Sequence, residues 1–272
     1  MIKNSLIIKK LNLEIDNVEL FNSLSLSLQT KSINFIINNS KLTNLFFKSV
    51  LNLTDSKIVA TLFNNKIEDS FEEIGYYHQD VDIYKDLTIK HYFELSQSYY
   101  KNDYTKELMN LISLFKIDIH KKIKNLDRQT YEVIKLIDCL YHNPSLIILY
   151  EPYIYLSYEF IEILNNYLLK LNNDGSTILI YTKKIYNLYS KTNKYFMFTN
   201  NKLVDITKLK VTNTYKISYE GKLTTKLKLL SLISNETCEL TYTGPLLLIL
   251  NDIIESKVEL LDIMEVKHEN TL

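Results

Sequence analysis

The residues best suited to chemistry follow a short apolar strand in the middle of the chain. In residues 144–157, "PSLIILYEPYIYLS", four apolar residues lead directly into Tyr150, Glu151 and Pro152. Ligands of open α/β sheets bind at the carboxyl ends of the strands, so an acid at this position indicates chemistry there. Glu151 has the chemistry of a general base. Tyr150 stands where the first of two acids would be expected.

The elements that must position Glu151 alternate between strands and helices. Apolar alternation and short apolar runs predict strands at residues 5–15, 20–30, 32–37, 57–67, 74–79, 145–150 and 176–182. Helical spacing predicts helices at residues 42–51, 89–99, 105–115, 130–142 and 157–171. Strands that alternate with helices indicate an α/β fold with a parallel sheet. A hairpin near Asn200 and Asn201 is expected to close this domain near residue 207.

The composition narrows the classes of protein. Lys plus Arg and Asp plus Glu number 32 each, and this zero net charge argues against a nucleic-acid partner. The two cysteines, Cys139 and Cys238, lie far apart, which argues against a disulfide framework or a metal site. No apolar run approaches the roughly 20 residues that span a bilayer. Only 4 glycines are present, and Gly75 and Gly175 stand at predicted turns, so glycine is kept where the backbone needs it.

The order of these landmarks resembles the ATP-binding subunit of an ABC transporter over about residues 5–205. Residues 74–100, "IGYYHQDVDIYKDLTIKHYFELSQSYY", are similar to the segment in which a strand ends at the Q-loop glutamine, here Gln79. Residues 126–152 resemble the signature motif, the signature helix and the Walker B strand. The tail "VELLDIMEVKHENTL", residues 258–272, is similar to the extension of subunits that export peptides or confer bacteriocin resistance.

The resemblance implies an ABC-type domain in residues 1–207, with a parallel sheet core, an antiparallel β subdomain and a helical subdomain. Residues 208–272 are expected to form a small C-terminal α+β appendage.

The phosphate-binding turn departs from the family's pattern. A working loop, GxxxxGK[ST], needs glycines so that backbone N–H groups can hold phosphates. Residues 37–45, "INNSKLTNL", contain no glycine and are one residue short, and Lys41 is displaced from the matching position. The positions that correspond to the ATP site are Asn38, Asn39, Ser40, Lys41, Thr43 and Gln79. The residues of this turn are better accounted for by an ordinary strand-to-helix turn, with Asn38, Asn39 and Ser40 capping the helix.

The other nucleotide positions depart in the same direction. In the signature motif, Asp127 places a negative charge where the family contacts phosphate, although it makes a good helix N-cap. Tyr150 replaces the Walker B aspartate, and a phenol does not replace a carboxylate as a ligand of a hard cation. Lys183 stands at the position where the family has its switch histidine. Ile15 lies near the position of the family's aromatic residue that stacks on adenine.

Three functions remain open. The first is a non-hydrolysing structural or regulatory subunit, without cofactor, on a membrane-spanning ABC subunit of a peptide-export or resistance system. A second ABC-type subunit is an additional expected partner, and the expected location is cytoplasmic, at the inner face of the membrane. The docking surface is expected at Tyr84, Asp86, Tyr92 and Phe93. The second function is a divergent active ATPase that uses ATP and magnesium with Glu151 and Gln79. The third is a stand-alone peptide-binding immunity or regulatory protein.

Overall fold

The computed structural model describes residues 4–37, 40–182, 188, 193–199, 201–207, 212–223, 229–233, 238–245, 249–250, 252–253, 256 and 258–266. The chain divides into two compact units, each made of separate segments. Unit 1 comprises Met1–Ile8, Ser27–Ile33 and Ala60–Ile180, and unit 2 comprises Lys9–Leu26, Asn34–Val59 and Tyr181–Leu272.

An N-terminal sheet has the strand order β2-β1-β4-β5. Its strands are β1 (Asn4–Ile15), β2 (Val18–Gln29), β4 (Lys57–Leu62) and β5 (Asn65–Lys66). Asp16 and Asn17 join β1 to β2 with positive φ angles of 51° and 61°, which is the geometry of a type I′ hairpin turn. The strands that alternation predicted at residues 5–15 and 20–30 are confirmed within one or two residues.

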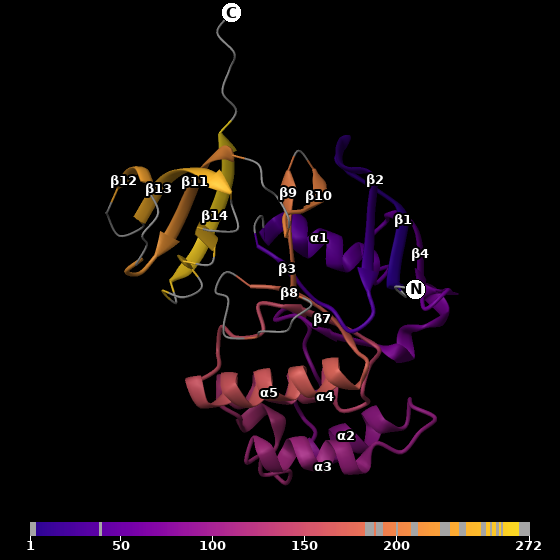
Figure 1. Cartoon of the computed structure of the whole chain (residues 1–272). Coiled ribbons are helices and arrows are strands. Elements are labelled where there is room, and N and C mark those ends of the chain that lie inside the picture. Colours follow the sequence, from indigo (N-terminus) through magenta and orange to yellow (C-terminus); the bar gives the residue numbers. More distant parts are fainter. Residues whose placement is uncertain are drawn as a thin grey trace, which may run out of the picture. The chain divides into compact units, whose positions relative to one another are not determined.

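Unit 1 contains neighbouring strands in the order β8-β7-β6, together with four of the helices. Figure 1 labels β7, β8 and these helices. The strands are β6 (Ile74–Tyr77), β7 (Leu146–Tyr150) and β8 (Thr177–Tyr181). The helices are α2 (Ile89–Gln97), α3 (Thr105–Leu114), α4 (Arg128–Leu140) and α5 (Tyr158–Asp174). β6 and β7 pair in parallel, with Ile74 opposite Leu146 and Tyr77 opposite Leu149. The carboxyl ends of β6 and β7 therefore lie side by side.

Side-chain caps fix where these helices begin. Thr88 caps α2, because its Oγ1 accepts a hydrogen bond from the backbone N–H of His91 at 3.2 Å. Ser157 caps α5 in the same way, with Phe160 N as the donor. Gly175, with φ 136°, ends α5 in a conformation that residues with a Cβ atom rarely adopt.

Gly75 has a different role from the turn that the sequence suggested. It lies within β6, and a Cβ atom at this position would collide with the carbonyl oxygen of Cys139 on α4. The same Cβ would lie 2.8 Å from Cγ of Pro144. The glycine is thus explained by the close approach of a helix backbone to a strand, and the prediction of a turn at this position is wrong.

Unit 2 has an aromatic core under α1 (Ser40–Val50). Neighbouring strands run in the order β10-β9-β3, with β3 at Ile33–Ile36, β9 at Asn193–Thr199 and β10 at Lys202–Asp205. Phe21 stacks on Phe198 with ring centroids 5.9 Å apart, and Phe46 of α1 meets both rings edge-on. Burial of such rings is the main stabilising contribution of this core.

The C-terminal strands form a separate antiparallel sheet with the order β12-β13-β11-β14. These strands are β11 (Thr212–Glu220), β12 (Leu229–Ile233), β13 (Cys238–Pro245) and β14 (Glu259–Val266). Tyr215, Ile217 and Tyr219 alternate on the buried face of β11, as the two-residue period of a strand requires. All four strands follow residue 207, and the domain boundary at that residue stays a prediction.

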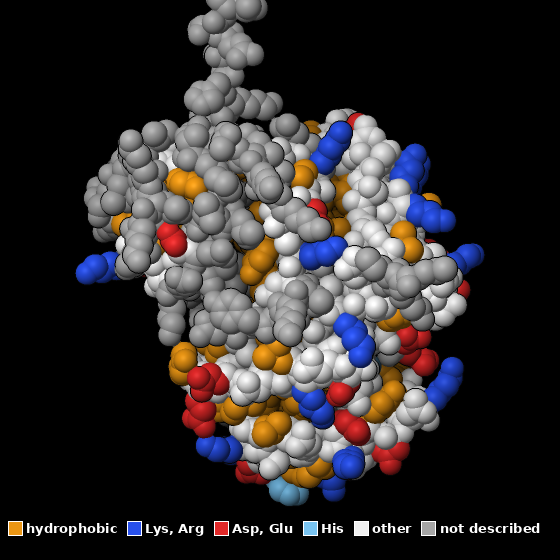
Figure 2. All heavy atoms as spheres, viewed as in Figure 1, with side chains coloured by type: hydrophobic (Ala, Val, Ile, Leu, Met, Phe, Trp, Pro, Cys, Tyr) orange, Lys and Arg blue, Asp and Glu red, His pale blue; other side chains and the backbone are white. Residues whose placement is uncertain are grey.

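Charged side chains of both signs are interspersed on the face shown in Figure 2, over its described residues. None of the described helices is long and apolar enough to cross a membrane.

Candidate functional site

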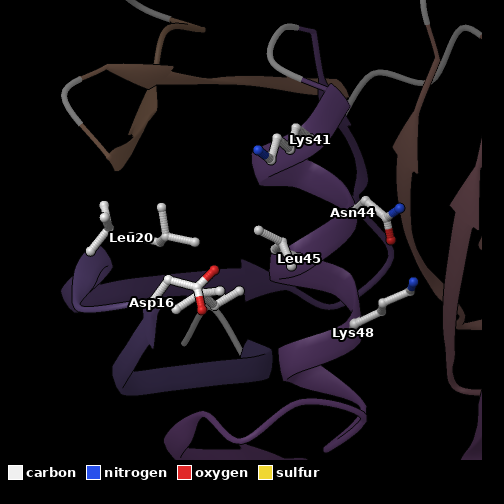
Figure 3. A pocket seen from close by; sticks show the side chains of 8 residues that line it. Asp16, Leu20, Lys41, Asn44, Leu45 and Lys48 are labelled. Atoms are coloured by element: carbon white, nitrogen blue, oxygen red, sulfur yellow. The ribbon is translucent and has the colours of Figure 1, made fainter.

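A hollow of about 380 Å³ in unit 2 lies where α1 passes the β1–β2 hairpin (Figure 3). We call it the hairpin pocket. Its lining residues are Ile15, Asp16, Val18, Leu20, Lys41, Asn44, Leu45 and Lys48. The pocket therefore combines an aliphatic surface with the charges of two lysines and one aspartate. Such a lining can hold a small molecule with an apolar part and an anionic part.

Two positions that the sequence resemblance singled out meet in the hairpin pocket. Lys41 is exposed in the first turn of α1, and Ile15, near the expected adenine-stacking position, lines the same hollow. Thr43 is fully buried, so its hydroxyl has no surface in this pocket. Asn38, Asn39 and the side chain of Ser40 lie outside the described residues. Only residues 37–39 separate β3 from α1.

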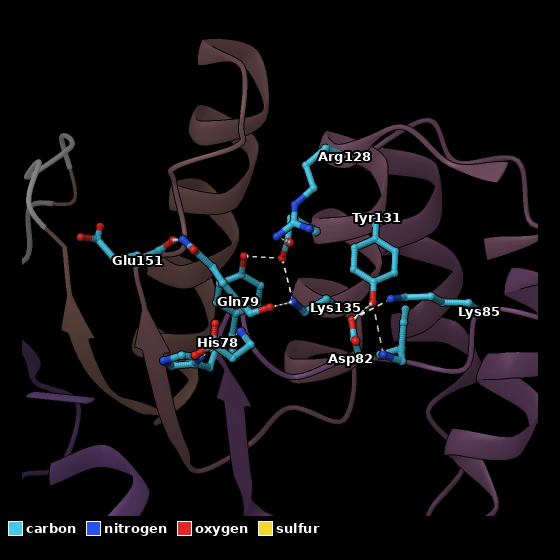
Figure 4. A network of polar contacts seen from close by, with 12 residues as sticks. His78, Gln79, Asp82, Lys85, Arg128, Tyr131, Lys135 and Glu151 are labelled. Atoms are coloured by element: carbon cyan, nitrogen blue, oxygen red, sulfur yellow. Dashed lines mark hydrogen bonds and ion pairs between the residues drawn. The ribbon is translucent and has the colours of Figure 1, made fainter. Parts of the chain in front are cut away.

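The strand ends of unit 1 bring Gln79 and Glu151 together. The side-chain Nε2 of Gln79 donates to the backbone carbonyl of Glu151 at 3.4 Å. Glu151 is 7% exposed and has a φ of 51°, a left-handed conformation that is uncommon for residues other than glycine and asparagine. Figure 4 shows its carboxylate pointing away from the residues of α4. The Q-loop position, Gln79, and the general-base candidate, Glu151, are thus adjacent through a side chain-to-backbone hydrogen bond.

Tyr150, at the end of β7, stacks on His78 at the end of β6. The ring centroids are 4.5 Å apart and the ring planes differ by 28°. His78 is buried, and its Nδ1 accepts a hydrogen bond from the backbone N–H of Asp80 at 3.0 Å. An aromatic stack therefore lies at the strand end where the sequence resemblance led us to look for a metal-binding acid.

The N-terminus of α4 is capped by its own chain. Oδ1 of Asp127 accepts from the backbone N–H of Thr130 at 3.0 Å, and Oδ2 accepts from the Thr130 hydroxyl at 2.7 Å. These hydrogen bonds from Thr130 hold the pKa of Asp127 below its usual range. The N-cap predicted from the sequence is confirmed. One of the backbone donors that a helix start offers to an anion is consequently bound by a carboxylate of this chain.

A buried polar network joins β6 to α4 (Figure 4). We call it the β6–α4 network. Oε2 of Glu132 accepts from the hydroxyl of Tyr77 at 2.7 Å and lies 2.9 Å from Nζ of Lys135. Nζ of Lys135 also donates to the backbone carbonyl of Gln79 at 2.8 Å, and Arg128 lies 2.6 Å from Oε1 of Glu132. Burial, with the charge of Glu132 as a second cause, raises the pKa of the Tyr77 hydroxyl.

Tyr131 of α4 holds the segment that follows Gln79. Its hydroxyl donates to Oδ1 of Asp82 at 2.8 Å and accepts from the backbone N–H of Ile83 at 3.3 Å. The bond from Tyr131 and the nearby Lys85, 3.2 Å away, lower the pKa of the Asp82 carboxyl. Helix α4 therefore contacts both the end of β6 and the loop beyond it.

Sequence reasoning missed the β6–α4 network. Helical spacing predicted α4, but Glu132 and Lys135 were not among the candidate residues. Their side chains are 1% and 4% exposed. The available signal was their spacing with Arg128, since residues three and four apart are neighbours on a helix surface.

The four residues expected to form the docking surface differ in how far they are exposed to solvent. Tyr84 is exposed, and Asp86 is exposed and lies 3.1 Å from Nζ of Lys124. Tyr92 is largely buried but lines a surface hollow together with Tyr84. Phe93 is 3% exposed and packs edge-on against Tyr141, so its side chain belongs to the core. Of the four expected residues, Tyr84 and Tyr92 therefore line the same surface hollow.

No group of three or more His, Cys, Asp or Glu side chains among the described residues is arranged to hold a metal ion.

The chain was compared with family models, curated proteins and solved structures. No family model matches the chain. An uncharacterized ABC transporter ATP-binding protein of Methanocaldococcus jannaschii is 23% identical over 142 residues, which is 50% of this chain and 54% of that protein. The chain thus matches about half the length of this curated relative.

Solved structures extend the similarity over more of the chain. An ATP-binding subunit of an ABC transporter aligns over 73% of this chain and 88% of its own, with a TM-score of 0.65 and 15% identity. The protein cbiO1 from Clostridium perfringens, described as part of the ABC transporter complex cbiONQ, aligns over 74% and 87%, with a TM-score of 0.60 and 16% identity. A putative ABC transporter ATP-binding protein from Pyrococcus furiosus covers 70% and 96%, with a TM-score of 0.59 and 14% identity.

These similarities define the class: the chain has the fold of the ATP-binding subunits of ABC transporters. The predicted fold class is confirmed. The curated relative adds a similarity in sequence over half of this chain.

Proposed function

We propose that the protein is an ABC-type subunit that does not hydrolyse ATP and serves a transporter as a structural or regulatory component. The observation that carries this proposal is the hydrogen bond from Thr130 N to the carboxylate of Asp127 at the start of α4. Helix N-termini attract anions through their free N–H groups and the helix dipole. The Asp127 carboxylate already accepts a hydrogen bond from a backbone N–H at this helix start, and its negative charge repels a phosphate.

Two further features support the loss of hydrolysis. The stack of Tyr150 on His78 places a phenol, not a carboxylate, beside Glu151 at the end of β7. A phenol does not hold magnesium as an aspartate does. The short connection between β3 and α1 lacks the glycines of a phosphate-binding loop. The proposal accordingly assigns no cofactor to the protein.

Nucleotide binding tests this proposal directly. The purified chain is titrated with labelled ATP and magnesium in equilibrium dialysis, and phosphate release is followed on the same sample. We expect no saturable binding at millimolar nucleotide and no phosphate release above buffer. Magnesium-dependent hydrolysis that disappears in Glu151→Gln would overturn the proposal.

That overturning result would establish the second candidate, a divergent ATPase. It is favoured by the contact of Gln79 with Glu151 and by the left-handed backbone of Glu151. Strained residues are concentrated at functional sites. The hairpin pocket, which both Lys41 and Ile15 line, would then be its first candidate for the nucleotide.

The proposed partner is a membrane-spanning ABC subunit, and the proposed location is the inner face of the membrane. The support is the similarity to cbiO1, which is described as part of a transporter complex. Peptide export or peptide resistance is proposed from the likeness of residues 258–272 to the tails of such subunits. Fractionation of native cells tests docking. If the chain docks on a membrane subunit, it should sediment with membranes and be released together with that subunit by detergent. A chain found only as a soluble monomer contradicts it.

A further inference from the structure

A second hollow, of about 330 Å³, lies on unit 1 beside α2. We call it the tyrosine pocket. It is lined by Tyr84, Tyr92, Leu95, Tyr99, Tyr100 and Asp138, together with Ser96. Tyr84 and Tyr99 are 67% and 71% exposed, whereas Tyr92 is largely buried. The pocket is therefore open to solvent, and its walls consist mainly of tyrosine rings.

Asp138 of α4 supplies the single charge of this lining. Its Oδ2 accepts from the Tyr92 hydroxyl at 2.7 Å, and its Oδ1 accepts from the Ser96 hydroxyl at 2.6 Å. Both donors are neutral, and no ion pair of Asp138 occurs among the described residues. Burial raises the pKa of the Asp138 carboxyl. The hydrogen bonds from Ser96 and Tyr92 lower this pKa, but by less than burial raises it. A positive charge in the pocket would stabilise the carboxylate.

We propose that the tyrosine pocket binds a basic side chain, arginine or lysine, of the protein partner, with Asp138 as its counter-ion. The inference rests on the proposed function, because it says which chemical group of the membrane-spanning subunit this chain would bind when the two dock. Cations bind to tyrosine ring faces within about 6 Å of the ring centre, and a carboxylate adds direct attraction.

Charge and composition favour this occupant over an anionic or an apolar one. The described lining contains no lysine, arginine or histidine. The lysines nearest in sequence are already paired: Lys85 lies 3.2 Å from Asp82, and Lys101 lies 3.9 Å from Glu72. Exposed tyrosines that flank a pocket are typical of protein interfaces. An apolar group in the pocket would leave the Asp138 carboxylate without a compensating charge.

Small probes test the inference without the partner. N-acetyl-arginine amide and its uncharged isostere N-acetyl-citrulline amide are titrated against the folded chain by ligand-observed NMR. We expect the arginine probe to bind at least about tenfold more tightly, because citrulline has nearly the same shape but lacks the positive charge and carries a carbonyl oxygen in place of one NH2 group. Equal binding of both probes, or binding of neither at millimolar concentration, overturns the inference.

Three variants locate the site. Asp138→Asn keeps acceptor and donor groups for Tyr92 and Ser96 and is expected to abolish the preference for arginine. Tyr84→Ala changes an exposed residue and is expected to weaken arginine binding several-fold without unfolding the protein. Tyr158→Ala, an exposed tyrosine of α5 outside the pocket, is the matched control and should bind as the wild type does. Unchanged preference in both pocket variants overturns the inference.

The inference and the proposed function can fail separately. A chain that sediments with a membrane subunit, but shows no preference for arginine over citrulline, retains the proposed function and loses the basic side chain. A chain that binds the arginine probe through Asp138, but never associates with a membrane subunit, loses the proposed partner and keeps a cation pocket.

Discussion

Nζ of Lys135 donates to the backbone carbonyl of Gln79 at 2.8 Å, which fastens the end of β6 to the middle of α4. The same ammonium lies 2.9 Å from the Glu132 carboxylate, which also accepts from Tyr77. The Gln79 side chain in turn donates to the backbone of Glu151. The ends of β6 and β7 and the helix are therefore joined by one set of buried and partly buried polar contacts.

Glu132→Ala should lower the free energy of unfolding by about 3–5 kcal/mol, because it leaves Lys135 buried without its counter-ion. Chemical denaturation measures this change. The matched control is Glu159→Ala, which removes an exposed carboxylate 2.9 Å from Lys116 and should cost about 1 kcal/mol or less. Similar losses in both variants would contradict a stabilising role of the network.

Gly75→Ala should also destabilise the protein, by about 1–3 kcal/mol or more, because the added methyl group forces α4 away from β6. The backbone oxygen of Cys139 cannot move independently of its helix. Thermal unfolding measures the effect. A variant as stable as the wild type would show that the helix and strand separate at little cost.

Burial lowers the pKa of His142 to about 4, and its ring stacks on Tyr100 with centroids 4.6 Å apart. The unfolded chain takes up a proton near pH 6.5 and the folded chain only near pH 4, so stability falls as the pH drops between these values. The loss should reach about 3 kcal/mol, since one pKa unit corresponds to about 1.4 kcal/mol.

Urea denaturation from pH 7 to pH 4 measures this dependence. The variant His142→Phe keeps a ring in the stack and removes the titrating group, so its stability should change less over the same range. Subtracting the two profiles cancels contributions from other groups, such as the Asp138 carboxyl. Parallel profiles for the two proteins would contradict the prediction.

Asp127→Ala should cost about 1 kcal/mol, because it removes the cap of α4. Asp127→Asn keeps an oxygen acceptor and should cost less. Since the folded pKa of Asp127 is lowered, the charge contributes stability above its unfolded pKa near 4 and loses it as the pH falls through the folded value. The difference between wild type and Asp127→Asn should therefore vanish in strong acid. A difference that is constant with pH would mean that the charge does not matter.

Most elements could be predicted because their signals are local. Apolar alternation predicted β1 and β2, helical spacing predicted α4, and the cap Asp127 was readable as a side chain just before an apolar periodic segment. The parallel pairing of β6 and β7 explains the adjacency of Gln79 and Glu151, because parallel strands bring their carboxyl ends to one edge.

By itself, the sequence determined the succession of strands and helices, the likeness to ABC subunits and the absence of glycine from the turn before α1. Only the tertiary structure decided that Glu132 and Lys135 are buried, that Gly75 admits a helix backbone, and that Asp138 lies among tyrosines. The reason is physical. Periodicity says which residues share a face of an element, but burial of a polar side chain depends on what another segment, some 50 residues away, brings against it.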